Sequence, residues 1–241
     1  FLHFFYKVAQ GCVQCAYNPY FLEWFIKPFG WLPWRTGYLL LGAVSIAALW
    51  WLARQLGGRP LAALLSPTFL WILWLGQIDI VPALGLGVAW WSTQKQKPAL
   101  AGLGLLLLAT KPQLGGFALL LFLLWNGWRA LVIPLIGALA SVAVYGLDWP
   151  LRWLSFTPQT VFGGDAWFYI APLWLLVSLV GVVFVRGRRE QLQYIVAATV
   201  AGAPFLGAYS FFVLLLFPLR WWEIAIAYVP FVLMGITANQ W

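Results

Sequence analysis

The chain alternates between apolar runs and short polar interruptions along most of its length. Several of the runs have only 11 to 15 residues, whereas a complete helical crossing of a membrane needs about 20. Short helices that stop inside a membrane favour a protein with an internal water-filled cavity, where irregular backbone is tolerated. The predicted spans are 36–53, 61–75, 80–91, 99–109, 114–125, 130–146, 168–185, 194–217 and 224–237.

Composition supports a membrane protein over a soluble one. The chain is 63% hydrophobic and 8% charged, against roughly 25% charged residues in a soluble domain. We therefore predict an all-α polytopic membrane protein with about 8–9 transmembrane or half-membrane helices around an outer-face cavity. Residues 36–241 form its helical domain. Residues 1–35 form an aromatic, Pro-rich segment on the outer face, with an interfacial helix at 20–30.

The first residues carry a C-x-x-C pair, Cys12 and Cys15, and no signal peptide. Because Phe1 is not a Met, we expect upstream residues to exist. The two thiols are ordinary cysteines or a local disulfide; a zinc site needs about four ligands, and His3 alone is nearby. We expect neither a metal nor a cofactor.

Charge distribution predicts the orientation of the spans. If residues 1–35 lie on one face, alternation puts eight basic residues and one acid on the opposite face, which is therefore cytoplasmic. The cytoplasmic set is Arg54, Arg59, Lys95, Lys97, Arg129, Arg186, Arg188, Arg189 and Glu190. The other six basic residues and five acids fall on the outer face. The net charge of +8 is thus a topology signal, and we expect no nucleic-acid partner.

Two polar segments interrupt the apolar runs on the same predicted outer face. The first is Gly76-Gln77-Ile78-Asp79, and the second is Thr110-Lys111-Pro112-Gln113. An Asp or a Lys at membrane depth is costly unless it serves a site or finds a partner. We therefore expect Gln77, Asp79 and Lys111 to open to one cavity, with Asp79 and Lys111 within about 10–12 Å of each other. Structural alternatives are a helix cap for Asp79 and a snorkelling side chain for Lys111.

These segments together resemble the GT87 family, polytopic glycosyltransferases of the GT-C superfamily. The resemblance consists of G-Q-I-D at 76–79, a basic turn followed by P-A-L-A-G at 98–102, and K-P-Q at 111–113. Upstream, Y-N-P at 17–19 and the segment 27–35 resemble the beginning of that family's pattern. The likeness covers roughly residues 17–130.

The resemblance implies transfer of a sugar from a polyprenyl-phosphate donor to an acceptor hydroxyl on the outer face, with inversion. It implies that Lys111 binds the lipid phosphate, and that Gln77 and Asp79 bind sugar hydroxyls or have a structural role. Gln113 is a further amide candidate, and Arg152 and Arg220 are phosphate candidates from charge and face alone. It also implies a multi-pass protein of a bacterial or archaeal plasma membrane that binds the bilayer and a lipid-linked donor.

One departure leaves alternatives open. The family's catalytic Asp precedes the Tyr-x-Pro segment, and residues 1–16 contain no acid. The catalytic residue is therefore unknown: it lies outside this sequence, or the protein is a degenerate relative. A non-catalytic subunit of a larger membrane complex is the alternative function, and a transporter is a third, although the two halves show no internal repeat.

Overall fold

The structure, a computed structural model, describes residues 5–12, 18–155, 173–174, 176–202, 208–220 and 224. Every regular element within these residues is a helix, so the all-α expectation is confirmed. The elements are α1 (Phe5–Ala9), η2 (Tyr20–Leu22), α2 (Glu23–Gly30), α3 (Trp34–Leu56), α4 (Pro60–Leu64), α5 (Pro67–Leu75), α6 (Ile80–Gln94), α7 (Pro98–Leu108), α8 (Pro112–Asn126), η3 (Trp128–Leu131), α9 (Val132–Tyr145), α10 (Trp149–Leu154), η4 (Val182–Phe184), α12 (Arg188–Gly202) and η5 (Ala208–Leu216).

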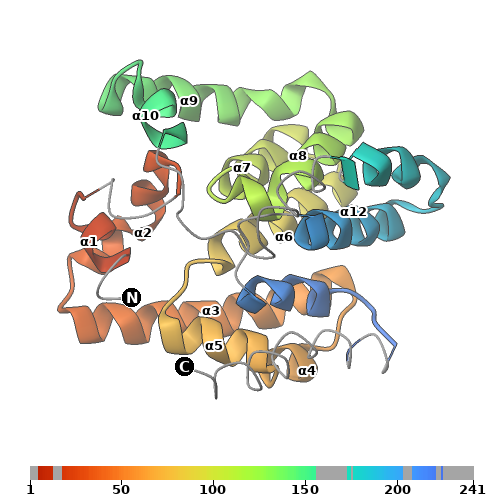
Figure 1. Ribbon diagram of the computed structural model, residues 1–241, viewed down its shortest axis with the longest axis horizontal. Coiled ribbons are helices and arrows are strands. Elements are labelled where there is room, and N and C mark those ends of the chain that lie inside the picture. Colours follow the sequence, from red (N-terminus) through yellow and green to blue (C-terminus); the bar gives the residue numbers. More distant parts are fainter. Residues whose placement is uncertain are drawn as a thin grey trace.

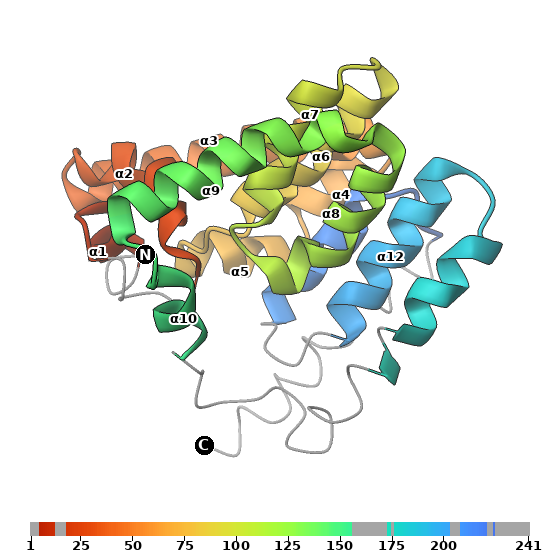
Figure 2. The ribbon, with the colours of Figure 1, turned by 90° about the horizontal axis from the view of Figure 1, so that it is seen from above.

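Two long helical stretches frame the molecule. Helix α3 and the η3–α9 unit run in opposite directions on opposite sides, with α6, α7 and α8 between them (Figures 1 and 2). Among the described residues, Trp34–Leu56 and Trp128–Tyr145 are the helices long and apolar enough to cross a membrane; Pro98–Leu108 and Leu114–Asn126 are shorter apolar helices. Two candidate spans are fewer than the predicted crossings, so the larger number, like the cavity, stays a prediction.

Helix α3 agrees closely with the predicted first span and has clear end signals. Pro33 precedes its first residue, and Gly57 ends it with a left-handed φ of 88°. Glycine adopts this conformation without the clash that a Cβ causes, which makes it the common residue just beyond a helix. The helix begins at Trp34, two residues before the start of the predicted span 36–53.

The predicted span 61–75 is two helices, because Ser66 and Pro67 separate α4 from α5. The Ser66 hydroxyl accepts a hydrogen bond from the backbone N–H of Phe69 at 3.2 Å, so it caps α5. Proline fits the first turn of a helix, where its missing N–H costs nothing. A second boundary also differs: the predicted span 194–217 begins at residue 194, but α12 is already helical from Arg188 onward.

Helices α6 and α7 pack closely because glycines face each other across the contact. A Cβ on Gly85 would lie 2.6 Å from the carbonyl oxygen of Gly104, and a Cβ on Gly104 would lie 2.5 Å from the backbone nitrogen of Ala89. Small residues let backbones approach in membrane helix pairs. This close pair positions the segments on either side of it, 76–79 before α6 and 109–111 after α7.

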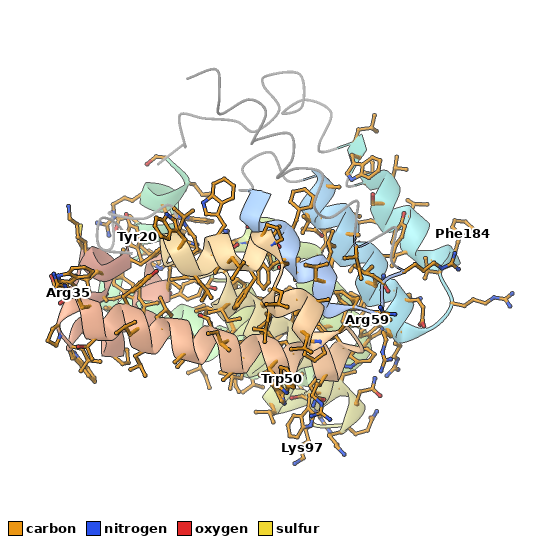
Figure 3. All side chains as sticks on the ribbon, turned by 90° about the horizontal axis from the view of Figure 1, so that it is seen from below. Tyr20, Arg35, Trp50, Arg59, Lys97 and Phe184 are labelled. Carbon is orange, nitrogen blue, oxygen red and sulfur yellow. The ribbon has the colours of Figure 1, made fainter. Side chains whose placement is uncertain are left out.

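Segments that carry the predicted cytoplasmic charges lie at one end of the molecule and contact one another. The Arg189 guanidinium lies over the Trp90 ring at 5.9 Å and beside Gly57, and the Arg188 guanidinium lies over Trp125 at 5.7 Å. Asn126 donates to Thr93 Oγ1 at 2.8 Å. Arg59 is labelled at this end, with Arg35 and Tyr20 at the other (Figure 3). These contacts bring the ends of α3 and α8 and the last turns of α6 next to the start of α12.

Many large apolar side chains of the two long helices face outward. Leu135 and Leu139 of α9 are 58% and 72% exposed, and Leu39 of α3 is 69% exposed. Such faces suit lipid better than water. The part of the chain outside the described residues includes 168–172 and 175 of the predicted span 168–185, all but the first residue of the span 224–237, and the acids Asp165 and Glu223.

Candidate functional site

Asp79 stands in a short turn between two helices. Gly76 ends α5 with a φ of 61°, and the chain then turns through Gln77 and Ile78 into α6. Asp79 occupies the position before the first residue of α6, yet its side chain makes no capping hydrogen bond. The helix-cap alternative for this carboxylate is therefore wrong, and the carboxylate is buried with no exposed surface.

Lys111 stands at the break between α7 and α8. Its backbone is extended (φ −143°, ψ 79°), and Pro112 opens α8. A residue before proline is biased toward extended backbone, so the Lys-Pro pair itself produces the break. The Lys111 side chain is 8% exposed and points into the protein, which excludes the snorkelling alternative.

The two segments meet in a buried ion pair. Lys111 Nζ donates to Asp79 Oδ1 at 2.7 Å, which confirms the predicted proximity of these two residues. Ser210, in η5, donates its hydroxyl to the same Oδ1 and accepts from Lys111 Nζ at 3.3 Å. Asp79 Oδ2 is buried without a hydrogen-bond partner among the described residues. One carboxylate oxygen is therefore bonded twice, and the other is left unsatisfied.

This arrangement is chemically costly. Transfer of two charges out of water costs several kcal/mol per ion in real proteins, and their attraction repays this only when the remaining hydrogen bonds are made. Here one acceptor oxygen of Asp79 lacks its bond. A hydroxyl group is the type of donor that satisfies a carboxylate oxygen such as Oδ2, and the Lys111 ammonium is a cation, the charge that attracts a phosphate. A polyhydroxylated phosphate ester matches both groups.

The N-terminal segment reaches the ion pair through Asn18. Asn18 Nδ2 donates to the carbonyl oxygen of Thr110 at 3.0 Å, and both residues are buried. This bond joins positions 92 residues apart and fixes residues 18–20 beside Lys111. Asn18 belongs to the Y-N-P motif, so two motif segments predicted from the sequence are in direct contact.

An aromatic cluster continues from Asn18 toward the ends of α9 and α10. Its buried rings are Tyr20, Phe21 and Trp149, with Trp24 and Tyr145 packed against them. The Trp24 and Tyr145 rings are stacked at 6.2 Å, and those of Tyr20 and Trp149 lie 5.8 Å apart. Ala109, two residues before Lys111, also packs here. The cluster therefore extends almost to the ion pair.

Glu23 is the one buried carboxylate of this cluster among the described residues. Tyr145 donates its hydroxyl to Glu23 Oε2 at 2.9 Å, and Lys27 Nζ lies 3.0 Å from Glu23 Oε1. The contact joins α2 to the end of α9, across 122 residues. Both oxygens of Glu23 have a partner, whereas only Oδ1 of Asp79 has one among the described residues. The Glu23 contact is therefore suited to holding the two helices together.

The other predicted site residues differ in their placement. Gln77 is partly buried in the turn before Asp79. Gln113 lies in α8, but its side chain is outside the described part. Arg152 pairs with Asp148 at 3.0 Å and lies over the Tyr20 ring at 5.9 Å, so it belongs to the aromatic cluster. Arg220 is an exposed residue beyond η5. The binding roles of these four residues stay predictions.

Sequence reasoning did not select Ser210, Asn18 or Glu23 as site residues. Ser210 is an isolated polar residue in an apolar run, the pattern that an ordinary membrane helix also shows. Cys12 is disulfide-bonded, so of the two alternatives for this residue, an ordinary thiol or a disulfide, the structure has the disulfide. The described residues contain no group of three His, Cys, Asp or Glu side chains that could hold a metal ion.

Comparison with known proteins agrees with this arrangement of motifs. The family described as glycosyltransferase family 87 matches residues 16–163, which include the Y-N-P segment, Asp79 and Lys111. Neither the curated proteins nor the solved structures contain a match to the chain. The matched part exceeds half of the 241 residues. The chain belongs to glycosyltransferase family 87.

Proposed function

We propose that this protein is an integral membrane glycosyltransferase that takes a sugar from a polyprenyl-phosphate donor and transfers it to an acceptor hydroxyl on the outer face. The observation that carries the proposal is the buried Asp79–Lys111 pair, with one carboxylate oxygen unsatisfied, at the meeting point of two family motifs. Family membership supports the reaction class, and the chemistry of the pair supports the donor.

Lys111 is the residue that we assign to the departing lipid phosphate. In the displacement, the acceptor oxygen forms a bond to the anomeric carbon, and the bond from that carbon to the phosphate oxygen breaks with its electron pair on the phosphate. The negative charge on this phosphate group needs a preorganised cation. An ammonium in a low-dielectric site stabilises it far better than in water. The acceptor proton goes to a base to which we assign no residue.

Asp79 is the residue that we assign to a hydroxyl of the donor sugar. A carboxylate oxygen is an acceptor only, and Oδ2 is buried without a partner among the described residues. Sugar and phosphate are bonded in the donor, so a hydroxyl acceptor beside a phosphate-binding ammonium fits one molecule. Gln77, in the same turn, is a second hydroxyl partner in this proposal.

The outer-face orientation rests on two supports. Arg59 lies at the opposite end of the molecule from Tyr20 and Arg35 (Figure 3), and the Arg189 guanidinium lies beside Gly57, two residues before Arg59. A concentration of basic residues at one end favours the cytoplasmic face there. A disulfide at Cys12 also suits an oxidising compartment. Both favour an outer-face location for the aromatic cluster and residues 18–30, and we propose that the polyprenyl-phosphate sugar is used on that face.

The direct test is transfer by the full-length protein in liposomes. Polyprenyl phosphates that carry glucose, galactose or mannose are supplied as donors, with the matching nucleotide sugars as controls and a membrane extract as the source of acceptors. Transfer from a lipid-linked donor, and none from nucleotide sugars, supports the proposal. Absence of transfer and of donor binding across the panel would favour a non-catalytic subunit instead.

A further inference from the structure

Asp79, Lys111 and Ser210 form a buried hydrogen-bonded cluster, and Ser210 is its member outside the family-matched segment. It is in η5, 131 residues after Asp79 and 99 residues after Lys111, whereas the family match ends at residue 163. Its side chain is fully buried. Its hydroxyl contacts both charged residues, as donor to Asp79 and acceptor from Lys111. A hydroxyl is one of the few small groups that can donate and accept at once.

The geometry of the three residues is asymmetric. Asp79 Oδ1 accepts two hydrogen bonds, one from Lys111 and one from Ser210, while Oδ2 accepts none among the described residues. Two donors on one oxygen fix the rotation of the carboxylate. A carboxylate with a single partner could rotate and share that partner between its oxygens. The second donor therefore determines which oxygen is left for a ligand.

We propose that Ser210 is a positioning residue, which holds Asp79 so that Oδ2 faces a hydroxyl of the donor sugar. This inference rests on the proposed function and deepens it, because it names the group that orients the sugar-binding carboxylate. An unsatisfied buried acceptor is costly, more so when it is charged. A hydroxyl donor of the sugar removes that cost only when the oxygen is correctly aimed. Polyhydroxylated ligands are thereby favoured over a bare lipid phosphate.

A bound water is the alternative occupant at Oδ2. Ordered waters commonly satisfy buried polar groups. Such a water would stabilise the fold, but it would give no preference for a sugar-bearing lipid. The two occupants therefore differ in one measurable quantity, the ratio of affinities for polyprenyl phosphate with and without a sugar.

The test compares three variants of the full-length protein in lipid nanodiscs. Ser210→Ala removes the hydroxyl, and Ser210→Thr keeps a hydroxyl at the same position. Ser45→Ala is the matched control, since Ser45 is also buried but its hydroxyl bonds only to the carbonyl of Leu41 in its own helix, at 2.7 Å. The probes are polyprenyl phosphate alone and polyprenyl phosphate that carries glucose, galactose or mannose. Affinity, donor KM and kcat, and thermal stability are measured for each protein.

For the sugar that the wild type prefers, Ser210→Ala should lower the affinity ratio roughly tenfold, the value of one hydrogen bond to a charged group. Donor KM should rise more than kcat falls. Ser210→Thr should keep the wild-type ratio, and Ser45→Ala should leave it unchanged. If Thr destabilises the protein by its extra methyl, the Ala and Ser45 variants still decide the result.

Three outcomes would contradict the proposals, and they do not all contradict the same one. A wild-type ratio retained in Ser210→Ala, in a protein that transfers sugar, overturns the positioning role alone and leaves the glycosyltransferase proposal intact. A lower thermal stability of Ser210→Ala with an unchanged ratio also overturns it, because that is the water-filled, structural case. A wild type that neither binds nor transfers any lipid-linked sugar overturns the proposed function, and this inference with it.

Discussion

Lys111 Nζ lies 2.7 Å from Asp79 Oδ1, and the two side chains are 8% and 0% exposed. Removal of one partner from a buried ion pair leaves the other charge uncompensated, which typically costs about 3–5 kcal/mol. Lys111→Met should therefore destabilise the fold by about that amount. The double variant Asp79→Leu/Lys111→Met, which removes both charges, should recover most of the loss.

Unfolding in mixed micelles, followed by circular dichroism, measures this cycle. In the double variant the Ser210 hydroxyl loses both of its charged partners, so the stability should not recover completely. If the double variant is less stable than Lys111→Met, the pair stabilises the fold more than isosteric apolar side chains do, and the account of its cost is wrong.

The glycine contact between α6 and α7 should tolerate no side chain. Gly85→Ala puts a Cβ 2.6 Å from the Gly104 carbonyl oxygen, which is backbone and cannot move aside. Overpacking of this kind costs about 1–3 kcal/mol. Gly42→Ala in α3 is the control, since a Cβ there meets nothing within 4 Å and helix propensity favours alanine. Thermal unfolding should show a lower Tm for Gly85→Ala and an equal or higher one for Gly42→Ala. Equal values for the two would contradict the close approach of these helices.

The two partners of Glu23, Tyr145 and Lys27, should contribute unequally to the stability of the fold. Tyr145→Phe leaves Glu23 Oε2 buried without its donor, which should cost about 1–3 kcal/mol. Lys27→Met should cost less than about 1 kcal/mol, because the Lys27 side chain is 51% exposed and its charge is screened by solvent. The same micelle-based unfolding measures both. A larger loss for Lys27→Met than for Tyr145→Phe would show that the ion pair, and not the hydroxyl, joins α2 to α9.

Thiol labelling tests the orientation. Arg59 and Asp148 are both exposed, at opposite ends of the predicted topology. Asp148→Cys should react with a membrane-impermeant reagent on intact cells, and Arg59→Cys should react only after the membrane is opened. The parent protein provides the background, and its Cys12 is disulfide-bonded. Reaction of both sites in intact cells would exclude the topology and the outer-face site with it.

The sequence was sufficient for features that depend on local signals. Pro33 and Gly57 mark the ends of α3, and Lys111-Pro112 marks the break between α7 and α8. The meeting of Asp79 with Lys111 was predictable because charge alternation put both on one face. Ser66-Pro67 is an equally local signal for the start of α5, but the apolar run around it concealed the boundary.

Other features depend on contacts between distant segments and have no local signal. Nothing in an apolar run distinguishes Ser210, which contacts a carboxylate 131 residues away, from Ser45, which bonds to its own helix. The Asn18–Thr110 and Glu23–Tyr145 bonds likewise join segments far apart in the chain. Such pairings follow from how the helices pack.

The central claim is that Lys111 stabilises the departing lipid phosphate. The most direct test measures sugar transfer by the Lys111→Met and Arg54→Met variants of the full-length protein, with a polyprenyl-phosphate sugar as donor. Lys111→Met keeps a side chain of similar length without its charge. Arg54→Met removes an exposed charge in the last turn of α3, at the end that the charge pattern predicts to be cytoplasmic. Loss of one preorganised contact to a developing charge typically lowers kcat by about 10²–10³. The account predicts a loss of that size or greater for Lys111→Met in protein that remains folded in the membrane, and near wild-type transfer for Arg54→Met. Wild-type transfer by Lys111→Met would contradict the account and remove Lys111 from the mechanism.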